Sequence, residues 1–449
     1  MHTVFARISP FVVQILGIIF ITIVAVLFSF QGMWNKPAVH IFHIIGAMSA
    51  FVALFSILYK RLYLQIDIKL LFVFFTYLWL SSVFVYGLSI AFFHSPTFCI
   101  WLIIFAVYCI VQIVPNSEKF LNWYSFVSAL SLGIMCFGVL YHAGQSLFME
   151  IPIQDTVRGC FRLGRLCGIT NANNLAFACY ALIIMSVFGF IRSSKLIKVF
   201  YLLTASTGWL CLGLTNSRTT IIGLAFTCAL FSFIMIRKYF GSTHSKTKNV
   251  LIAAFISLFV MFGVLASFNF ILPIYRSSMM FLNHRTDNPN LNNNLLSLSY
   301  RGLLDDNGTL TDRTLIWTSC IKSSFKNVRR ALLGTTQLGI DRIGGIYAGR
   351  HDITVAHAHN AYLEILRRYG LIGLSIWLAF LIIWCRNGIK QLFCNGEKSS
   401  ILFLLCSVAG ILLISTTEPY PLARFELNYL DFPFLIAGAY CIRYGRVEL

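Results

Sequence analysis

The sequence predicts an all-α integral membrane protein with about twelve transmembrane helices and one large outer loop that contains amphipathic helices. Two observations support this class. Of the 449 residues, 58% are hydrophobic and only 11% are charged, whereas ordinary soluble domains carry about 25% charged residues. Uncharged apolar runs also recur along the whole chain, and each approaches the ~20 residues that a helix needs to cross a bilayer.

The apolar runs place nine expected spans before the loop and three after it. These spans cover residues 11–30, 39–59, 68–92, 97–114, 122–142, 174–191, 198–214, 219–236, 249–272, 370–385, 399–416 and 430–442. The chain then divides into spans one to nine at 1–272, the outer loop at 273–368, and spans ten to twelve at 369–449. The first run is longer than the apolar part of a signal peptide, so we expect it to remain as a span.

The distribution of Lys and Arg sets the expected orientation. With twelve spans and the N-terminus inside, sixteen of these residues lie in cytoplasmic loops and ends, whereas the short outer loops hold three, Lys36, Arg218 and Arg424. This excess follows the positive-inside rule, from which long loops are exempt. Both termini are therefore expected in the cytoplasm, and segments 143–173 and 273–368 outside it.

The two long outer segments carry more positive charge than the topology requires. Segment 273–368 holds twelve basic residues against seven acidic ones. Such a surface suits an anionic partner such as a lipid phosphate or pyrophosphate, although membrane headgroups alone would explain any single arginine. Nucleic acid is not an expected partner, because this face lies outside the cytoplasm and no binding motif accompanies the charge.

One amphipathic helix is expected inside the large loop. Trp317, Ile321, Phe325 and Val328 recur at helical spacing with basic residues on the other faces, and Asp312 is the expected N-cap. Such a helix can lie flat on membrane lipids and cover the bundle.

The segment that follows contains three histidines, His351, His357 and His359. His359 and Asn360 are expected to open a short helix that ends at Arg368, before Gly370. A neutral imidazole can accept a proton, as a general base must, although a histidine at a membrane surface can also be a structural hydrogen-bonding residue. Zinc is not expected, because no nearby carboxylate or cysteine set completes a recognisable ligand spacing. No other metal or cofactor is expected either.

Two further ionisable residues lie at the outer ends of expected spans. Arg218 begins a span, where its guanidinium and the free backbone N–H groups of the helix start form a candidate anion site. The alternative is an arginine that merely reaches to the interface. Glu418, at the outer end of the eleventh span, is a candidate to bind a sugar hydroxyl or to pair with an arginine.

The 13 cysteines fall mostly inside the expected spans, where they serve as small apolar side chains. Cys160 and Cys167 differ, since both lie in an outer segment where oxidation is possible. The sequence leaves open whether these two residues form a disulfide.

Four motifs together resemble those of the bacterial O-antigen ligase and polymerase superfamily. The string from His359 to Leu374 is similar to the superfamily signature, and Leu214–Thr220 and Thr311–Trp317 are similar to its two arginine motifs. Arg165–Ala176, with its Asn-rich helix start, resembles a fourth motif. The order, the spacing and the single large loop agree over roughly residues 160–385.

This resemblance implies a metal-independent glycosyltransferase in the bacterial inner membrane, with its active site on the periplasmic face. The donor would be a glycan on undecaprenyl pyrophosphate. By the same resemblance, His359 is the base that deprotonates the acceptor hydroxyl, and Arg218 and Arg313 hold the departing pyrophosphate. The further substrate-binding residues expected are Arg165, Asn174, Asn360 and Glu418.

The acceptor is not settled by the motifs. A ligase transfers the glycan to a lipid A core sugar, and a polymerase transfers it to another lipid-linked repeat unit. We favour the ligase slightly, and a capsule or wall polymerase if the source has no outer membrane. A third branch of the superfamily glycosylates proteins and usually carries extra sequence after its last spans. We do not favour it, because only a few residues follow the twelfth expected span. A transporter or lipid flippase is the alternative from another class, but it would show inverted repeats, and the two halves are not similar.

Overall fold

The structure is a computed structural model. It describes residues 8–30, 39–87, 95–147, 160–162, 165–168, 171–240, 246–283, 309–335, 343–347, 350–355, 357–393, 399–421 and 428–444. Nine long helices come first, α2 (Pro10–Ser29), α3 (Val39–Tyr59), α4 (Ile66–Tyr86), α6 (Ser95–Ile113), α7 (Ser117–Leu147), α8 (Ala172–Arg192), α9 (Lys195–Thr215), α10 (Arg218–Phe240) and α11 (Lys246–Asn283). They are followed by α13 (Thr309–Ser324), α14 (Val328–Leu333), α15 (Ala361–Phe393), α16 (Ser399–Ser415) and α17 (Asp431–Tyr444).

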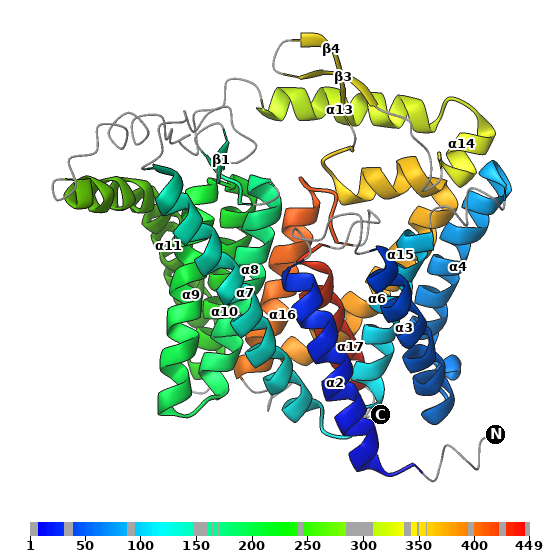
Figure 1. Ribbon diagram of the computed structural model, residues 1–449, viewed down its shortest axis with the longest axis horizontal. Helices are drawn as coiled ribbons and strands as arrows, with labels where there is room; N and C mark the ends of the chain where they lie inside the picture. The colour runs from blue at the N-terminus through cyan, green and yellow to red at the C-terminus, as the bar shows by residue number, and fades with distance from the viewer. Residues whose placement is uncertain are drawn as a thin grey trace.

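The strands form two short antiparallel hairpins. The first pairs β1 (Phe161–Arg162) with β2 (Arg165–Leu166), and the second pairs β3 (Ile343–Tyr347) with β4 (Arg350–Val355). Both hairpins lie at the same end of the helical bundle as α13 and α14, which we call the α13 end (Figure 1).

Each of the twelve expected spans falls on one helix. Within the described residues, eight helices are long and apolar enough to cross a membrane, and three shorter apolar helices cover His43–Tyr59, Phe98–Ile113 and Ser399–Ser415. The prediction of an all-α membrane protein is confirmed at this level. Several expected boundaries lie elsewhere. Helix α11 continues to Asn283, eleven residues beyond the expected end of its span at 272. Helix α4 ends at Tyr86, and residues 88–92 of its expected span lie outside the described residues. Helices α7 and α15 end at Leu147 and Phe393, beyond the expected 142 and 385.

The expected N-cap of the loop helix is wrong by one turn. Helix α13 begins at Thr309, so Asp312 lies inside its first turn.

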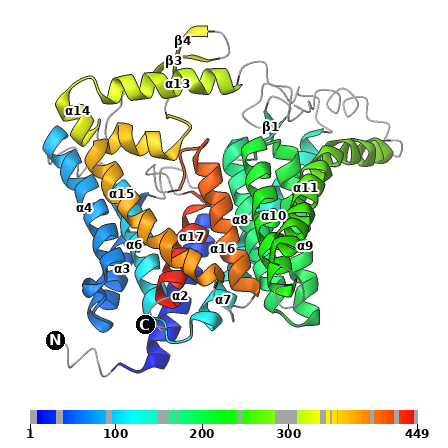
Figure 2. The same ribbon diagram turned by 180° about the vertical axis from the view of Figure 1, so that it is seen from behind.

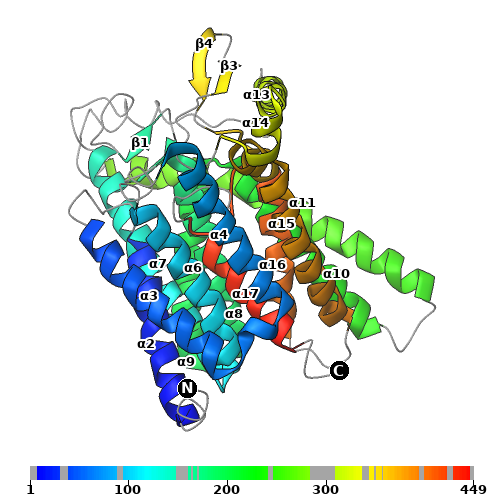
Figure 3. The ribbon, with the colours of Figure 1, turned by 90° about the vertical axis from the view of Figure 1, so that its right-hand side faces the viewer.

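The helices form two groups with α15, α16 and α17 between them (Figures 1 and 2). Helices α2, α3, α4 and α6 lie toward one side, and α8 to α11 toward the other. The start of α2 and the end of α17 both lie opposite the α13 end (Figure 1). Figure 3 shows α13 and α14 together beyond the ends of the other helices. The two ends of the described chain therefore share one side of the bundle.

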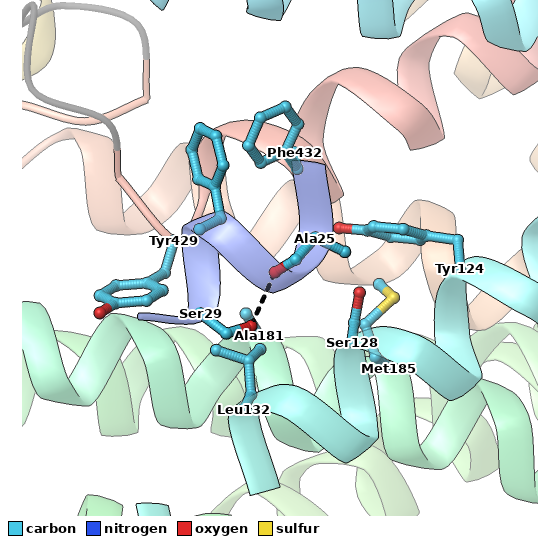
Figure 4. Close-up of a pocket in the computed structure, with 10 residues that line it drawn as sticks. Ala25, Ser29, Tyr124, Ser128, Leu132, Ala181, Met185, Tyr429 and Phe432 are labelled. Atoms are coloured by element: carbon cyan, nitrogen blue, oxygen red, sulfur yellow. Dashed lines mark hydrogen bonds between the residues drawn. The ribbon is translucent and has the colours of Figure 1, made fainter. Parts of the chain in front are cut away.

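The bundle is closely packed where α2, α7, α8 and α17 meet. One cavity, between α2, α7 and α8, has a volume of about 20 Å³, which is room for about one water molecule. In its wall the Ser29 hydroxyl donates to the carbonyl of Ala25, over 2.8 Å (Figure 4). This space is too small to hold a substrate.

A joint between α14 and α15 attaches the α13 end to the bundle. Helix α15 is interrupted at Gly370, whose φ of 64° and ψ of −169° are accessible essentially to glycine alone. A Cβ at Gly370 would collide with the carbonyl of Leu332 in α14. From α4, the Tyr77 hydroxyl donates to the carbonyls of Tyr369, over 2.7 Å, and Leu332, over 3.3 Å. The first part of α15 is thereby held at an angle across the bundle end.

Candidate functional site

A buried carboxylate at the α13 end joins three elements. Glu418, just after α16, is only 3% exposed. Its Oε1 lies 3.4 Å from Nη2 of Arg313 in α13 and accepts a 3.1 Å hydrogen bond from Nδ2 of Asn173 in α8. Its Oε2 lies 3.7 Å from Nδ1 of His359, just before α15. Of the two roles expected for Glu418, the structure shows the pairing with an arginine.

His359 has an unusual backbone conformation. Its φ of 49° lies in the left-handed region, which residues other than glycine adopt mainly where surrounding contacts impose it. Helix α15 begins at Ala361, with Asn360 as its N-cap, because Asn360 Oδ1 accepts the N–H of Leu363 over 3.0 Å. Asn360 Nδ2 also donates to the carbonyl of Thr416 over 2.8 Å. Asn360 thus joins the start of α15 to the chain that carries Glu418.

Arg313 owes its position to the packing of α13. Ile316, Cys320 and Ala358 form a small buried cluster, with Trp317 and Leu363 packed against it. Burial raises the pKa of the Cys320 thiol to about 12. Cys320 is therefore a neutral core residue that donates to the Leu363 carbonyl over 3.5 Å, and the docked helix holds the Arg313 side chain beside Glu418.

Arg165 reaches the same network through Asn173. From the β1–β2 hairpin, Arg165 Nε donates to the carbonyl of Thr215 over 2.7 Å, and Nη2 donates to Asn173 Oδ1 over 3.0 Å. Ser217 also donates to Asn173 Oδ1, over 3.3 Å. Two nitrogens of Arg165 are therefore bound by the protein, and Thr215 and Ser217 connect the Leu214–Thr220 motif to the network beside Arg218.

Asn173 is a site residue that sequence reasoning missed in favour of its neighbour. The N–H of Asn174 donates to the Asn171 side chain, over 2.8 Å, in the cap of α8. Asn173 lies one turn before Phe177, whose ring packs against Tyr420 with the ring centroids 5.5 Å apart. Only this packing tells which asparagine of the run faces Glu418.

Arg218 follows Ser217 of the network, and its side chain lines a separate small cavity. It is the first residue of α10 and is half-buried. Its side chain lines a cavity of about 10 Å³ together with Asn216, Asn269 and apolar residues of α9, α10 and α11. The structure thus joins His359, Glu418, Arg313 and Arg165 in one network, with Arg218 at its edge.

The histidines near the site and the cysteines of the bundle core do not form a joint group of metal-ligand atoms among the described residues. The rings of His357 and His359 have centroids 4.0 Å apart, and the side chain of His351 lies outside the described residues. Among the residues described, one group places metal-ligand atoms together, and it consists of Cys136, Cys179 and Cys211 in the bundle core. The N–H of Cys167 donates to the Cys160 carbonyl over 2.7 Å, and these two cysteines do not form a disulfide in the structure.

Fold and network define a helical membrane protein with a polar site at one end of its bundle. Residues 200–378 match the family model described as O-antigen ligase. This confirms the resemblance seen in the motifs, and the region belongs to the O-antigen ligase and polymerase superfamily. The family implies glycosyltransferase-type enzymes with lipid-linked glycan substrates. The comparison with curated proteins found no match for the chain.

Proposed function

We propose that this protein transfers a glycan from undecaprenyl pyrophosphate to an acceptor hydroxyl at the outer face of the bacterial inner membrane. One observation carries the proposal: within the matched family region, Arg313 and His359 meet at the buried carboxylate of Glu418. A base, a carboxylate that orients it and a cation for the leaving group are the parts that glycosyl transfer needs.

His359 acts as the base in this proposal. In this proposal Glu418, whose Oε2 lies 3.7 Å from Nδ1, orients the ring through that nitrogen, and Nε2 accepts the proton of the acceptor hydroxyl. The acceptor oxygen then bonds to the anomeric carbon while the bond from that carbon to the pyrophosphate oxygen breaks. Glu418 would stabilise the imidazolium that forms.

Arginines hold the pyrophosphate that departs. One nitrogen of Arg313 faces Glu418, and because a guanidinium has five N–H donors in a fork, the others remain for phosphate oxygens. Arg218, at the start of α10, supplies the second cation. Arg165 acts indirectly by holding Asn173 in place. No step requires a metal or a cofactor.

The polyprenyl chain of the donor has a suitable place in the bundle. An apolar cavity of about 400 Å³ is lined by residues of α8, α9, α10 and α16, among them Trp209, Leu224 and Phe231. Leu224 follows Arg218 by six residues on α10, which is roughly 9 Å along a helix. A lipid with its pyrophosphate at Arg218 would therefore enter this cavity with its tail.

The acceptor we propose first is a sugar of the lipid A core, which makes the protein an O-antigen ligase; a lipid-linked repeat unit, and hence a polymerase, is the alternative. A strain lacking the protein separates them. Long glycans left on the carrier, with none on the lipid A core, would support the ligase. Single repeat units would support the polymerase, and an unchanged glycan profile would contradict both.

A further inference from the structure

The residue just before the proposed base is held from two sides. Ala358 is fully buried. Its N–H donates to Glu364 Oε2 in α15 over 2.9 Å, and its carbonyl accepts the indole N–H of Trp317 in α13 over 3.0 Å. Both backbone polar groups of Ala358 are therefore bound by side chains from two separate helices. We call Trp317, Ala358 and Glu364 the Ala358 clamp.

Glu364 is itself held firmly. It is fully buried, its Oε1 lies 2.8 Å from Nη2 of Arg367, and it also pairs with Arg368. The Arg367 carbonyl accepts the N–H of Thr335, over 2.9 Å, at the end of α14. A buried carboxylate with two guanidinium partners cannot move without leaving charge unpaired, so Glu364 gives Ala358 a rigid anchor.

The clamp adjoins the left-handed backbone of His359. A non-glycine residue keeps such a conformation only when contacts on both sides impose it. The Ala358 clamp acts before His359, and the Asn360 cap with its bond to Thr416 acts after it. Together they turn the imidazole toward Glu418.

The same clamp relates the base to an arginine. Arg313 and Trp317 are four residues apart on α13 and therefore lie on one face of the helix. When the Trp317 indole binds the Ala358 carbonyl, α13 is set at a defined position relative to His359, and Arg313 is brought beside Glu418.

We propose that Trp317 and Glu364 are positioning residues that hold His359 and Arg313 in a common frame through the backbone of Ala358. This inference rests on the proposed function, in which His359 is the base. The clamp residues do not touch the reacting atoms. Their loss should lower turnover more than it weakens binding of the donor lipid, because Arg218 is not positioned by the clamp.

Trp317→Phe is the direct test, because it keeps an aromatic ring and removes the indole N–H. Measured on the purified full-length protein with a lipid-linked glycan, kcat should fall by up to about 10²-fold, while KM for the donor changes far less. Trp123→Phe is the matched control. The Trp123 indole donates to Thr22 over 2.8 Å between α7 and α2, away from the site, and its loss should leave both constants unchanged.

Glu364→Gln is the second variant and decides the question if Trp317→Phe does not reach the membrane. It keeps the shape of the side chain and removes the charge. Its control is Glu118→Gln, which breaks the 2.9 Å ion pair with Arg192 elsewhere in the bundle. Turnover should fall only in the Glu364 variant.

A double-mutant cycle with His359→Ala shows whether the clamp acts through the base. In the residual activity of His359→Ala, adding Trp317→Phe should cause a clearly smaller loss than it causes in the wild-type protein, because only the part that acts through Arg313 remains. Unchanged kcat in both clamp variants, or an equally large loss without His359, would overturn the proposal. Full activity of His359→Ala alone would instead refute the proposed function, so the two failures differ.

Discussion

At the scale of single residues, Glu418 explains why separate motifs depend on one another. It contacts Arg313, Asn173 and His359 from a position outside all four recognised motifs. The sequence identified Glu418 as an unusual ionisable residue, because a carboxylate at the end of an apolar span is costly unless it is paired. It did not identify Asn173, because three asparagines lie at the start of α8 and only tertiary packing distinguishes them.

Removing the base should nearly abolish glycan transfer. His359→Ala should lower the rate by about 10²- to 10⁴-fold, the usual contribution of a general base, and Glu418→Gln should lower it by a smaller factor. Transfer in vitro by purified variants measures both. His357→Ala distinguishes a single base from a zinc site. If His359 acts alone, His357→Ala should remain active and EDTA should not inhibit transfer. If zinc is required, both the substitution and EDTA should stop transfer. His142→Ala, at the exposed end of α7, is the control. Normal activity of His359→Ala would refute the assignment.

Lysine should replace either of the two arginines only in part. Arg313→Ala and Arg218→Ala should both stop transfer while the protein still reaches the membrane. Lysine should rescue only in part, because it supplies a point charge without the forked donors. Partial rescue is measured as surface glycan in complemented cells, and full activity of both alanine variants would reduce the arginines to markers of the membrane interface.

At the scale of elements, the helices were predictable and their relations at the α13 end were not. Long apolar runs interrupted by Gly, Pro and charged residues mark each helix in the sequence itself. By contrast, the Ala358 clamp pairs residues 41 and six positions apart through one backbone group, and no local pattern encodes such a meeting. The break in α15 at Gly370 was predictable in part. The glycine in the sequence indicated a break, but only the structure shows that the carbonyl of Leu332 lies where a Cβ would be.

Gly370→Ala should disrupt the joint between α14 and α15. The backbone conformation there excludes a Cβ at a cost of about 1–3 kcal/mol, and the collision with Leu332 adds to that cost. Both the thermal unfolding midpoint in detergent and transfer activity should fall. Gly263→Ala is the control, because a Cβ at that position in α11 meets nothing within 4 Å. Equal stability of the two variants would show that the joint does not hold the site.

At the scale of the whole molecule, the proposed topology places both termini in the cytoplasm and the α13 end outside. The shared side of the two chain ends and the excess of cytoplasmic basic residues both favour it (Figure 1). The composition was enough to predict the membrane class, because few charges and many apolar runs leave a chain no stable place in water. The number of crossings depends on the shorter helices and belongs to the proposal.

Reporter fusions test this topology directly. Alkaline phosphatase is active only outside the cytoplasm, so a fusion near residue 293, which lies outside the described residues, should be active. A fusion near Lys246, at the start of α11, should be silent. The reverse pattern would overturn the orientation and the proposed access of the donor lipid.

The position of Glu418 has a consequence for modularity. The matched family region covers residues 200–378. It contains Arg218, Arg313 and His359, but Asn173 lies before it and Glu418 after it. A chimera that exchanged only residues 200–378 with a relative would combine the base of one protein with the carboxylate of another. An exchange that keeps the site intact would have to include the ends of α8, α13, α15 and α16 together. These segments are separated in the sequence and meet only in the folded protein.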